Sequence, residues 1–415
     1  MAEPIIAAAV QPRWKRYSDE GTLRDDLGRF MRLAHDKGAD VVLFPELTGL
    51  MLVGPLAADK KEPLQKRSGL FGRVFGSLGG EPELADVLPT LITEYAEELI
   101  ERYIVLFGGL AYEYRMLLVA GSLLAQTPEG SIEYRAGVFD ANGTLMGWQS
   151  KLHLTEQDGT VAEEGADLTA FEADFGRFGV LIGHDLLFPE LAHSLAFRGC
   201  VALFHPTLAR SRDSWRRQQI VARARAQENQ LFLAQSFLVG TNDLFIGEHN
   251  DFAGRSAVLA PVELSPRGDG VLGEVGAEKV EGVVAGQWNI PALRDLWESA
   301  EVPIRQIARV ELFSELYNRL PAYYGDEPSI ARPARELTEW EPAQLEALPP
   351  TSQAPDLPEP PLDPPVETEP GSDAVTDLEF EAVEEQALNA RSVPIIDPDT
   401  GYYLGERRVG ARDDA

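Results

Sequence analysis

Three short segments place polar side chains of reactive types next to apolar stretches. Glu46 follows the apolar residues of VVLFPEL, and Lys151 begins KLHL after a predicted hairpin arm. The third segment, GVLIGHDLLFPE, is interrupted by Gly183, His184 and Asp185. Ligands and catalytic groups gather at the carboxyl ends of strands in open α/β sheets. The three segments therefore predict one shared site.

The residue types at this site indicate acyl-transfer chemistry. A carboxylate can act as a general base, and an ammonium group can stabilise negative charge that develops on a carbonyl oxygen. Alone, a strand-end carboxylate is more often a helix cap or an ion-pair partner, and a single lysine is usually solvated. Together, and in this order along the chain, Glu46 and Lys151 indicate a catalytic site more specifically than either residue does alone. No Cys or Ser stands in the third segment, where a nucleophile is expected.

The elements around these segments predict an α/β domain, because short β-rich apolar runs alternate with helical patterns. A helix is predicted over residues 22–37, between the first two strands, and Asn142-Gly143 predicts a hairpin. Residues 52–106 are interpreted as an elaboration that includes a helix from 88 to about 103 and covers or shapes the pocket. The predicted strands are 5–10, 41–44, 117–121, 134–140, 178–183, 201–204, 232–237 and 257–259.

At these residues the chain resembles the nitrilase superfamily of carbon-nitrogen hydrolases. RARAQENQLFLAQSFLVG (residues 223–240) and FAGRSAVLAP (residues 252–261) are also similar to signatures of that family. The resemblance covers roughly residues 4–330. It implies a four-layer α-β-β-α sandwich whose protomers form homodimers or higher homo-oligomers, and a small amide or nitrile-like ligand. It implies no cofactor.

The resemblance also implies roles for single residues. Glu46 matches the family's general base and Lys151 matches the lysine that stabilises the tetrahedral intermediate. Position 183, where the family has its nucleophilic cysteine, is glycine, which has no side chain to form an acyl-enzyme but can adopt the strained turn geometry. For the second carboxylate of the family, Asp158 is the best match and Glu156 is its rival.

Two other residue sets are candidate replacements for the missing nucleophile. Cys200 begins the next predicted strand and is interpreted as an ordinary buried core residue. His184 and His205 could approach Glu46 and Asp185 and hold a water-activating metal ion, although their spacing matches no recognised metal motif. Hydrogen-bonded pocket histidines are the more common outcome, so no metal is assigned.

The composition argues against nucleic acid and membranes as binding partners, and it bears on the cellular location. The chain has 415 residues and a net charge of −30, which opposes binding to nucleic acid and to anionic membranes. No apolar run approaches the ~20 residues of a membrane span. The single cysteine precludes an internal disulfide and agrees with a cytoplasmic location.

The sequence predicts two regions. Residues 1–335 form the nitrilase-like domain, and residues 336–415 form an acidic, Pro-rich tail. Residues 336–390 contain fifteen Asp or Glu and no Lys or Arg, which predicts a disordered linker. A short amphipathic helix is predicted near residues 376–388, followed by a turn and a short strand.

Three functional hypotheses follow from these residues. The leading one is a pseudoenzyme that lacks the Cys nucleophile and acts as a ligand-binding or scaffolding subunit. The alternative is a hydrolase of amide or nitrile C–N bonds in which Glu46, alone or with a metal ion, activates water. In a variant of that alternative, Gly183 replaces a native Cys of an ordinary amidase. The third places the function in the acidic tail, as a binding segment for a basic partner.

Overall fold

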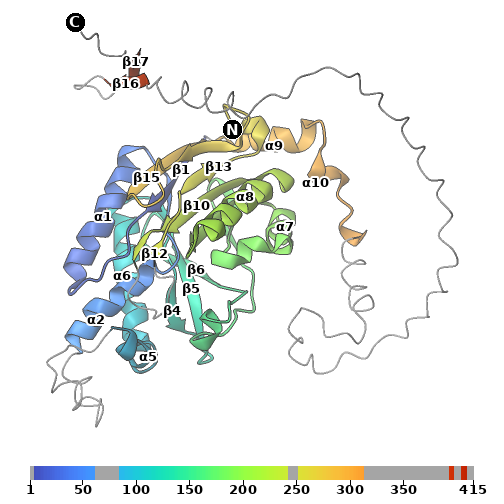
Figure 1. The fold of residues 1–415 in the computed structure, drawn as a ribbon. Helices are drawn as coiled ribbons and strands as arrows, with labels where there is room; N and C mark the ends of the chain where they lie inside the picture. The colour runs from blue at the N-terminus through green and yellow to red at the C-terminus, as the bar shows by residue number, and fades with distance from the viewer. Residues whose placement is uncertain (1–3, 61–83, 242–250, 313–391, 397–402, 409–415) are drawn as a thin grey trace, which may run out of the picture. The chain divides into compact units, whose positions relative to one another are not determined.

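A computed structural model describes residues 4–60, 84–241, 251–312, 392–396 and 403–408 (Figure 1). The chain separates into two compact units, residues 1–325 and 326–415. The predicted acidic linker and the predicted helix near residues 376–388 lie outside the described residues.

Two mixed β-sheets form the centre of the first unit. The first has the order β15-β1-β2-β3-β5-β4, with β6 also paired to β5, and the second has the order β14-β13-β10-β9-β8-β7. Strands β1, β2 and β3 run parallel, as do β8, β9 and β10. The first sheet comprises β1 (Ile5–Gln11), β2 (Val41–Leu43), β3 (Leu117–Val119), β4 (Leu123–Gln126), β5 (Ile132–Phe139), β6 (Leu145–Ser150) and β15 (Gly282–Trp288). The second comprises β7 (Ala170–Ala173), β8 (Gly176–Val180), β9 (Cys200–Leu208), β10 (Phe232–Leu238), β13 (Ala257–Leu259) and β14 (Val271–Glu274).

The sheets are apolar on both faces, which explains why the strands read as continuous hydrophobic runs. In β1, Ala7 and Ala9 face the second sheet, while Ala8 and Val10 face a separate core beneath the helices. Helices α1 and α6 cover the outer face of the first sheet, and α7 and α8 cover that of the second (Figure 1). The fold is therefore the predicted four-layer α-β-β-α sandwich.

The helices begin where the sequence supplies caps. Asp19 accepts a hydrogen bond from the Thr22 N–H at the start of α1, and Ser211 accepts one from the Ser214 N–H at the start of α8. The α-helices are α1 (Glu20–Asp36), α2 (Val53–Asp59), α5 (Leu84–Glu94), α6 (Ala96–Tyr114), α7 (Pro189–Phe197), α8 (Arg212–Glu228), α9 (Ile290–Ser299) and α10 (Ile304–Ile307). Short 3₁₀ turns are η1 (Thr48–Leu52), η2 (Asp158–Thr160), η3 (Gly183–Leu187) and η4 (Val262–Leu264).

The helical stretch predicted from residue 88 to about 103 is confirmed, but it is divided between two helices, α5 and α6. The chain leaves helical geometry at Tyr95, whose φ is −118° and ψ is 26°, so α5 ends and α6 begins there. Helix α6 is also part of the outer layer, because the Tyr103 hydroxyl donates to the Gly121 carbonyl and accepts from the Gly137 N–H.

One hairpin of the described chain follows from a local sequence signal. The predicted Asn142-Gly143 hairpin is confirmed: β5 pairs with β6 across this turn, and Gly143 has a φ of +80°. Small pairs are also formed by β11 (Gly240–Thr241) with β12 (Asp251–Phe252), and by β16 (Ser392–Ile396) with β17 (Tyr403–Arg408). The β16–β17 pair is a hairpin where the sequence predicted a turn and one strand.

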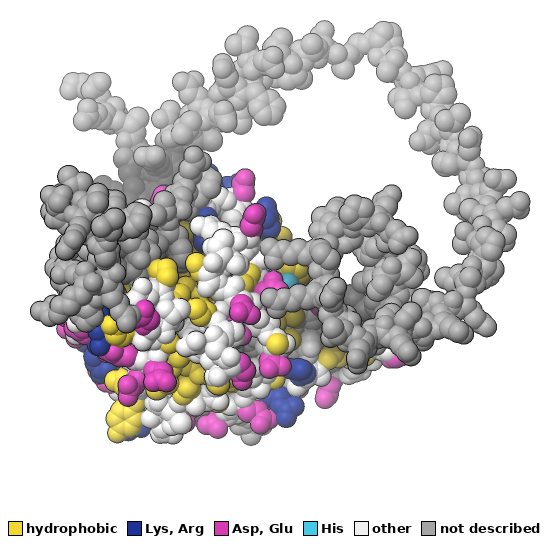
Figure 2. Space-filling model, turned by 90° about the horizontal axis from the view of Figure 1, so that it is seen from below, with side chains coloured by type: hydrophobic (Ala, Val, Ile, Leu, Met, Phe, Trp, Pro, Cys, Tyr) yellow, Lys and Arg dark blue, Asp and Glu magenta, His cyan; other side chains and the backbone are white. Residues whose placement is uncertain are grey.

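The face of the molecule that Figure 2 shows carries charges of both signs. On the face seen in Figure 2, acidic and basic side chains alternate with hydrophobic ones and are not sorted into one field. Among the helices of the described ranges, none is long and apolar enough to cross a membrane.

Candidate active site

Glu46 lies just past the end of β2, where a left-handed residue turns the chain into η1. Leu47 has a φ of +66°, and its N–H donates to the Ser122 hydroxyl at 3.1 Å. This turn buries the Glu46 side chain, which is 5% exposed. The strand end thus delivers a carboxylate to the interior.

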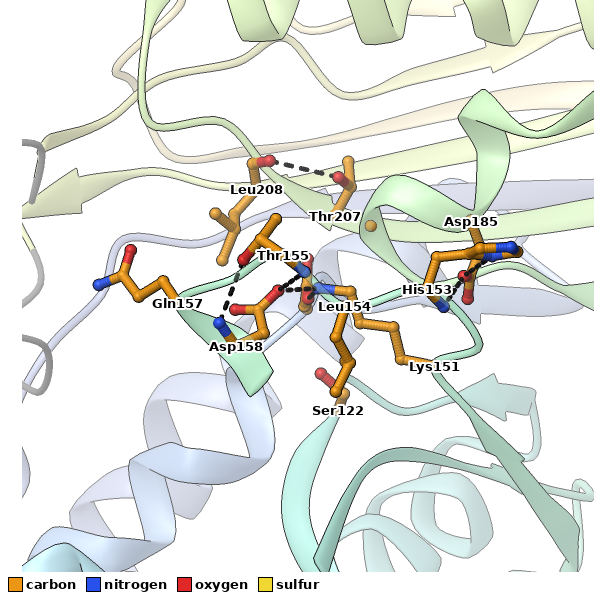
Figure 3. A network of polar contacts seen from close by, with 12 residues as sticks. Ser122, Lys151, His153, Leu154, Thr155, Gln157, Asp158, Asp185, Thr207 and Leu208 are labelled. Atoms are coloured by element: carbon orange, nitrogen blue, oxygen red, sulfur yellow. Dashed lines mark hydrogen bonds and ion pairs between the residues drawn. The ribbon is translucent and has the colours of Figure 1, made fainter. Parts of the chain in front are cut away.

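Lys151 directly follows β6 and joins two carboxylates. Its ammonium group donates to Glu46 Oε1 at 2.8 Å and to Asp158 Oδ2 at 2.9 Å, and its side chain is 2% exposed. Figure 3 shows Lys151 beside Asp158. Asp158 is held in place because its N–H donates to the Thr155 hydroxyl. Glu156, the rival carboxylate, is exposed. The three buried groups form what we call the carboxylate–lysine trio: Glu46, Lys151 and Asp158.

Burial and pairing act in opposite directions on the pKa values of the trio. Burial raises the pKa of Glu46, and the Lys151 charge offsets this only in part. For Asp158, the Lys151 charge and hydrogen bond outweigh the effect of burial and lower its pKa. Burial alone would lower the pKa of Lys151, but the two carboxylates raise it above its usual value. Lys151 is therefore an ammonium ion, and Glu46 is the more basic carboxylate of the two.

Gly183 forms the turn between β8 and η3 in a left-handed conformation. Its φ is +55°, a region that glycine adopts without strain. An ideal Cβ on this residue would lie 2.6 Å from Glu46 Oε2 and 3.1 Å from Glu46 Cδ. The Glu46 carboxylate thus abuts the place that a side chain at position 183 would enter.

Asp185 joins the Gly183 turn to the segment that carries Lys151. Its buried carboxylate accepts from the N–H groups of Leu152 and His153 and is 3.1 Å from His153 Nδ1 (Figure 3). The His153 ring also stacks on Phe188, with centroids 3.6 Å apart. Asp185 therefore has a positioning role at this edge of the sheet.

The two candidate histidines have different surroundings. His184 lines the cavity, burial lowers its pKa, and its buried Nδ1 has no hydrogen-bond partner among the described residues. His205 is fully buried within β9, with Nε2 2.8 Å from the Gly183 carbonyl and Nδ1 2.9 Å from Gln235 Nε2. Burial lowers the pKa of His205 to about 3, so the ring is neutral.

These contacts bear on the metal hypothesis for His184 and His205. Both ring nitrogens of His205 have partners, so a metal ion bound there would break one of these bonds. The described part of the chain contains no group of three His, Cys, Asp or Glu side chains placed to hold a metal ion.

Cys200 begins β9 and is fully buried. Burial raises the pKa of its thiol to about 11, so the thiolate is scarce at neutral pH. This environment is that of a core residue.

A cavity of about 400 Å³ opens above the trio, and Arg210 is one of the residues that line it. The sequence analysis did not identify Arg210, although this residue stands just past the end of β9, as Glu46 stands just past the end of β2. None of the described residues between 52 and 106 lines the cavity, and residues 61–83 of this region lie outside the described residues. The lining residues are Glu46, Leu47, Tyr134, Lys151, Thr155, Glu156, Gln157, Asp158, His184, Leu208, Arg210 and Ser214.

Comparison with known proteins shows which family this chain belongs to. The chain is 28% identical over 321 residues to the probable hydrolase YhcX of Bacillus subtilis, covering 77% of this chain but only 56% of that protein. It is 27% identical to the omega-amidase NIT2-A of Xenopus laevis, over 54% of this chain and 79% of that protein.

A solved structure shows the same fold. It is a mutant of the amidase from Nesterenkonia sp. AN1 with acrylamide added at the active site cysteine; it shares 21% identity, with a TM-score of 0.53, over 75% of this chain and 99% of that chain. The carbon-nitrogen hydrolase family model matches residues 6–262. This chain therefore belongs to the carbon-nitrogen hydrolase family.

Proposed function

We propose that the cavity binds a small amide or nitrile-like molecule, and that this chain forms no covalent acyl-enzyme with it. In this proposal, Gly183 stands where the family has its cysteine. The protein is then a ligand-binding or scaffolding pseudoenzyme of a hydrolase family.

The observation that carries the proposal is the contact between Gly183 and Glu46. A nucleophilic side chain at position 183 would begin 2.6 Å from Glu46 Oε2, closer than a carbon and an oxygen atom can approach without displacement. The Glu46 carboxylate would have to move, although Lys151 holds it at 2.8 Å. The arrangement thus fits a site that works without a side chain at this position.

The trio has a role without catalysis. A buried ammonium between two carboxylates is stable only while its partners remain, and removing one partner of such a pair costs about 3–5 kcal/mol. Loss of either Glu46 or Lys151 would therefore destabilise the fold, which gives a reason to retain both without catalysis. Both residues also line a polar cavity with donors and acceptors for an amide group.

Ammonia release and ligand binding test the proposal together, across a panel of amides, nitriles and carbamoyl compounds. We expect the unaltered protein to bind panel members without releasing ammonia. In the Gly183→Cys variant, Glu46 Oε2 must first swing away from the added Cβ while Oε1 keeps its bond to Lys151, and we then expect turnover of some panel members. Gly183→Ala is the matched control, because it adds the same Cβ, with roughly 1–2 kcal/mol of backbone strain, but no thiol. Ammonia release by the unaltered protein would refute the pseudoenzyme.

A second candidate is hydrolysis by activated water. It is favoured by the raised pKa of Glu46, which suits a general base, and by the place of this carboxylate beside the Gly183 turn. Under this hypothesis the unaltered protein releases ammonia and Glu46→Gln abolishes the release. Retained release in Glu46→Gln would exclude Glu46 as the base.

We also propose that the protein is a cytoplasmic homodimer or higher homo-oligomer that binds neither nucleic acid nor membranes. The family membership and the charge of −30 support this assembly and these exclusions. Light scattering coupled to gel filtration measures the assembly, and a monomeric mass at micromolar concentration would contradict it.

A further inference from the structure

We infer that Arg210 sets the net charge of the cavity and thereby selects uncharged ligands over cationic ligands of the same shape. The inference rests on the proposed binding function and adds the charge class of the ligand and the residue that determines it.

Arg210 is anchored against the turn that carries Asp158. Its Nη1 donates to the Gln157 side-chain oxygen, and its Nη2 lies 3.9 Å from Asp158 Oδ1. Its side chain is 26% exposed, whereas those of Lys151 and Asp158 are 2% and 8% exposed. The guanidinium therefore lies on the outer side of the trio and faces the oxygen of Asp158 that Lys151 does not bond.

The formal charges of Glu46, Asp158, Lys151 and Arg210 balance. Glu46 and Asp158 contribute two negative charges when ionised, and Lys151 contributes one positive charge, so the trio alone carries −1. Arg210 supplies the second positive charge and brings the sum to zero. Glu156 also lines the cavity, but it is exposed and its charge is screened by water.

This balance determines which ligand charge the cavity favours. Inside a partly buried site the effective dielectric constant is far below that of water, so one uncompensated charge acts strongly on a bound molecule. With Arg210 present, a neutral amide meets a neutral set of groups, and a cation gains no net attraction while losing its hydration. Without Arg210, the trio's charge of −1 would attract a cation.

An amide and its amidinium analogue provide the test, because they share shape and differ by one positive charge. Binding of butanamide and butanamidinium is measured by calorimetry on the full chain and on its variants. In Arg210→Gln, we expect the affinity ratio of amidinium to amide to rise by roughly tenfold, about 1.4 kcal/mol. Arg210→Lys keeps the charge and should restore the original ratio.

Arg212→Gln is the matched control. Arg212 lies two residues further on, is 65% exposed and pairs with Glu278, and it does not line the cavity. This variant removes the same formal charge from the protein and should leave the ratio within twofold of the original. If Arg210→Gln leaves the ratio unchanged, or if Arg212→Gln raises it equally, the inference is wrong.

Failure of the proposed function gives a different result. If neither compound nor any panel amide binds, the binding function fails, and the charge balance is then tested by thermal unfolding. The loss of Tm caused by Arg210→Gln should shrink in an Asp158→Asn background, because the two charges compensate each other. Equal losses in both backgrounds would overturn the role of Arg210.

Discussion

At the scale of single residues, Lys151 bonds both Glu46 and Asp158 and thereby joins three positions that lie far apart or in separate loops of the chain. Glu46 and Lys151 were predictable because each follows a strand that the hydrophobic pattern marks. The choice of Asp158 over Glu156 depends on the path of residues 152–158, which turn through η2 and direct only Asp158 inward. The contact of Glu46 with the Gly183 turn is likewise a product of packing.

His205 makes a prediction about acid stability. Its pKa is about 3 in the folded protein and about 6.5 when unfolded. As the pH falls below 6.5, the unfolded chain binds a proton that the folded chain refuses, so stability falls until about pH 3. The slope from this group approaches about 1.4 kcal/mol per pH unit.

Chemical denaturation between pH 7 and pH 4 measures this slope. We expect a shallower slope in His205→Gln, whatever its stability at pH 7. His35→Gln is the control, because the His35 side chain is 61% exposed, and it should keep the slope of the unaltered protein. Identical slopes in all three proteins would refute the assigned role of His205.

Cys200 makes a prediction about thiol reactivity. Because the thiol is fully buried and its pKa is about 11, a maleimide reagent should label it only after denaturation. Mass spectrometry of native and denatured samples measures the labelling. Rapid labelling of the native protein would show that Cys200 is accessible and would reopen its candidacy as a nucleophile.

At the scale of elements, the parallel strands of both sheets and the Asn142-Gly143 hairpin could be predicted, because the patterns that specify them are local. Strands β4, β7, β14 and β15 were not predicted. The break between α5 and α6 could not, since the apolar pattern continues across Tyr95. The pairing of β9 with β10, which brings Gln235 to His205, is also a long-range result. The sequence thus predicted the parts, and the tertiary packing determined their contacts.

Helix α8 holds the Gly183 turn through Arg225. This buried guanidinium donates to the carbonyls of Leu186 and Leu187 at 3.1 and 3.0 Å.

Arg225→Met would leave both carbonyls without this donor and should lower the free energy of unfolding by about 3 kcal/mol. The free energy of unfolding in urea measures the loss, and Arg223→Met, on the exposed side of the same helix, should change it by less than about 0.5 kcal/mol. Equal losses in the two variants would contradict this role.

At the scale of the whole molecule, charge determines which partners can approach. Half of the net charge of −30 lies in residues 336–390. Binding to duplex DNA requires clustered positive charge, so we expect no electrophoretic shift even at about 50 mM salt. A shift that weakens as salt is added would show a basic surface that the composition conceals.

The central claim, that the cavity binds an amide without turning it over, is tested most directly by one calorimetric titration with small amides. Binding alone gives heat that returns to the baseline after each injection, whereas hydrolysis gives heat that continues while substrate remains. The account predicts saturating heats that return to the baseline for at least one amide. Sustained heat would show that the protein is an active hydrolase, and no heat with any amide would show that the cavity is not an amide site.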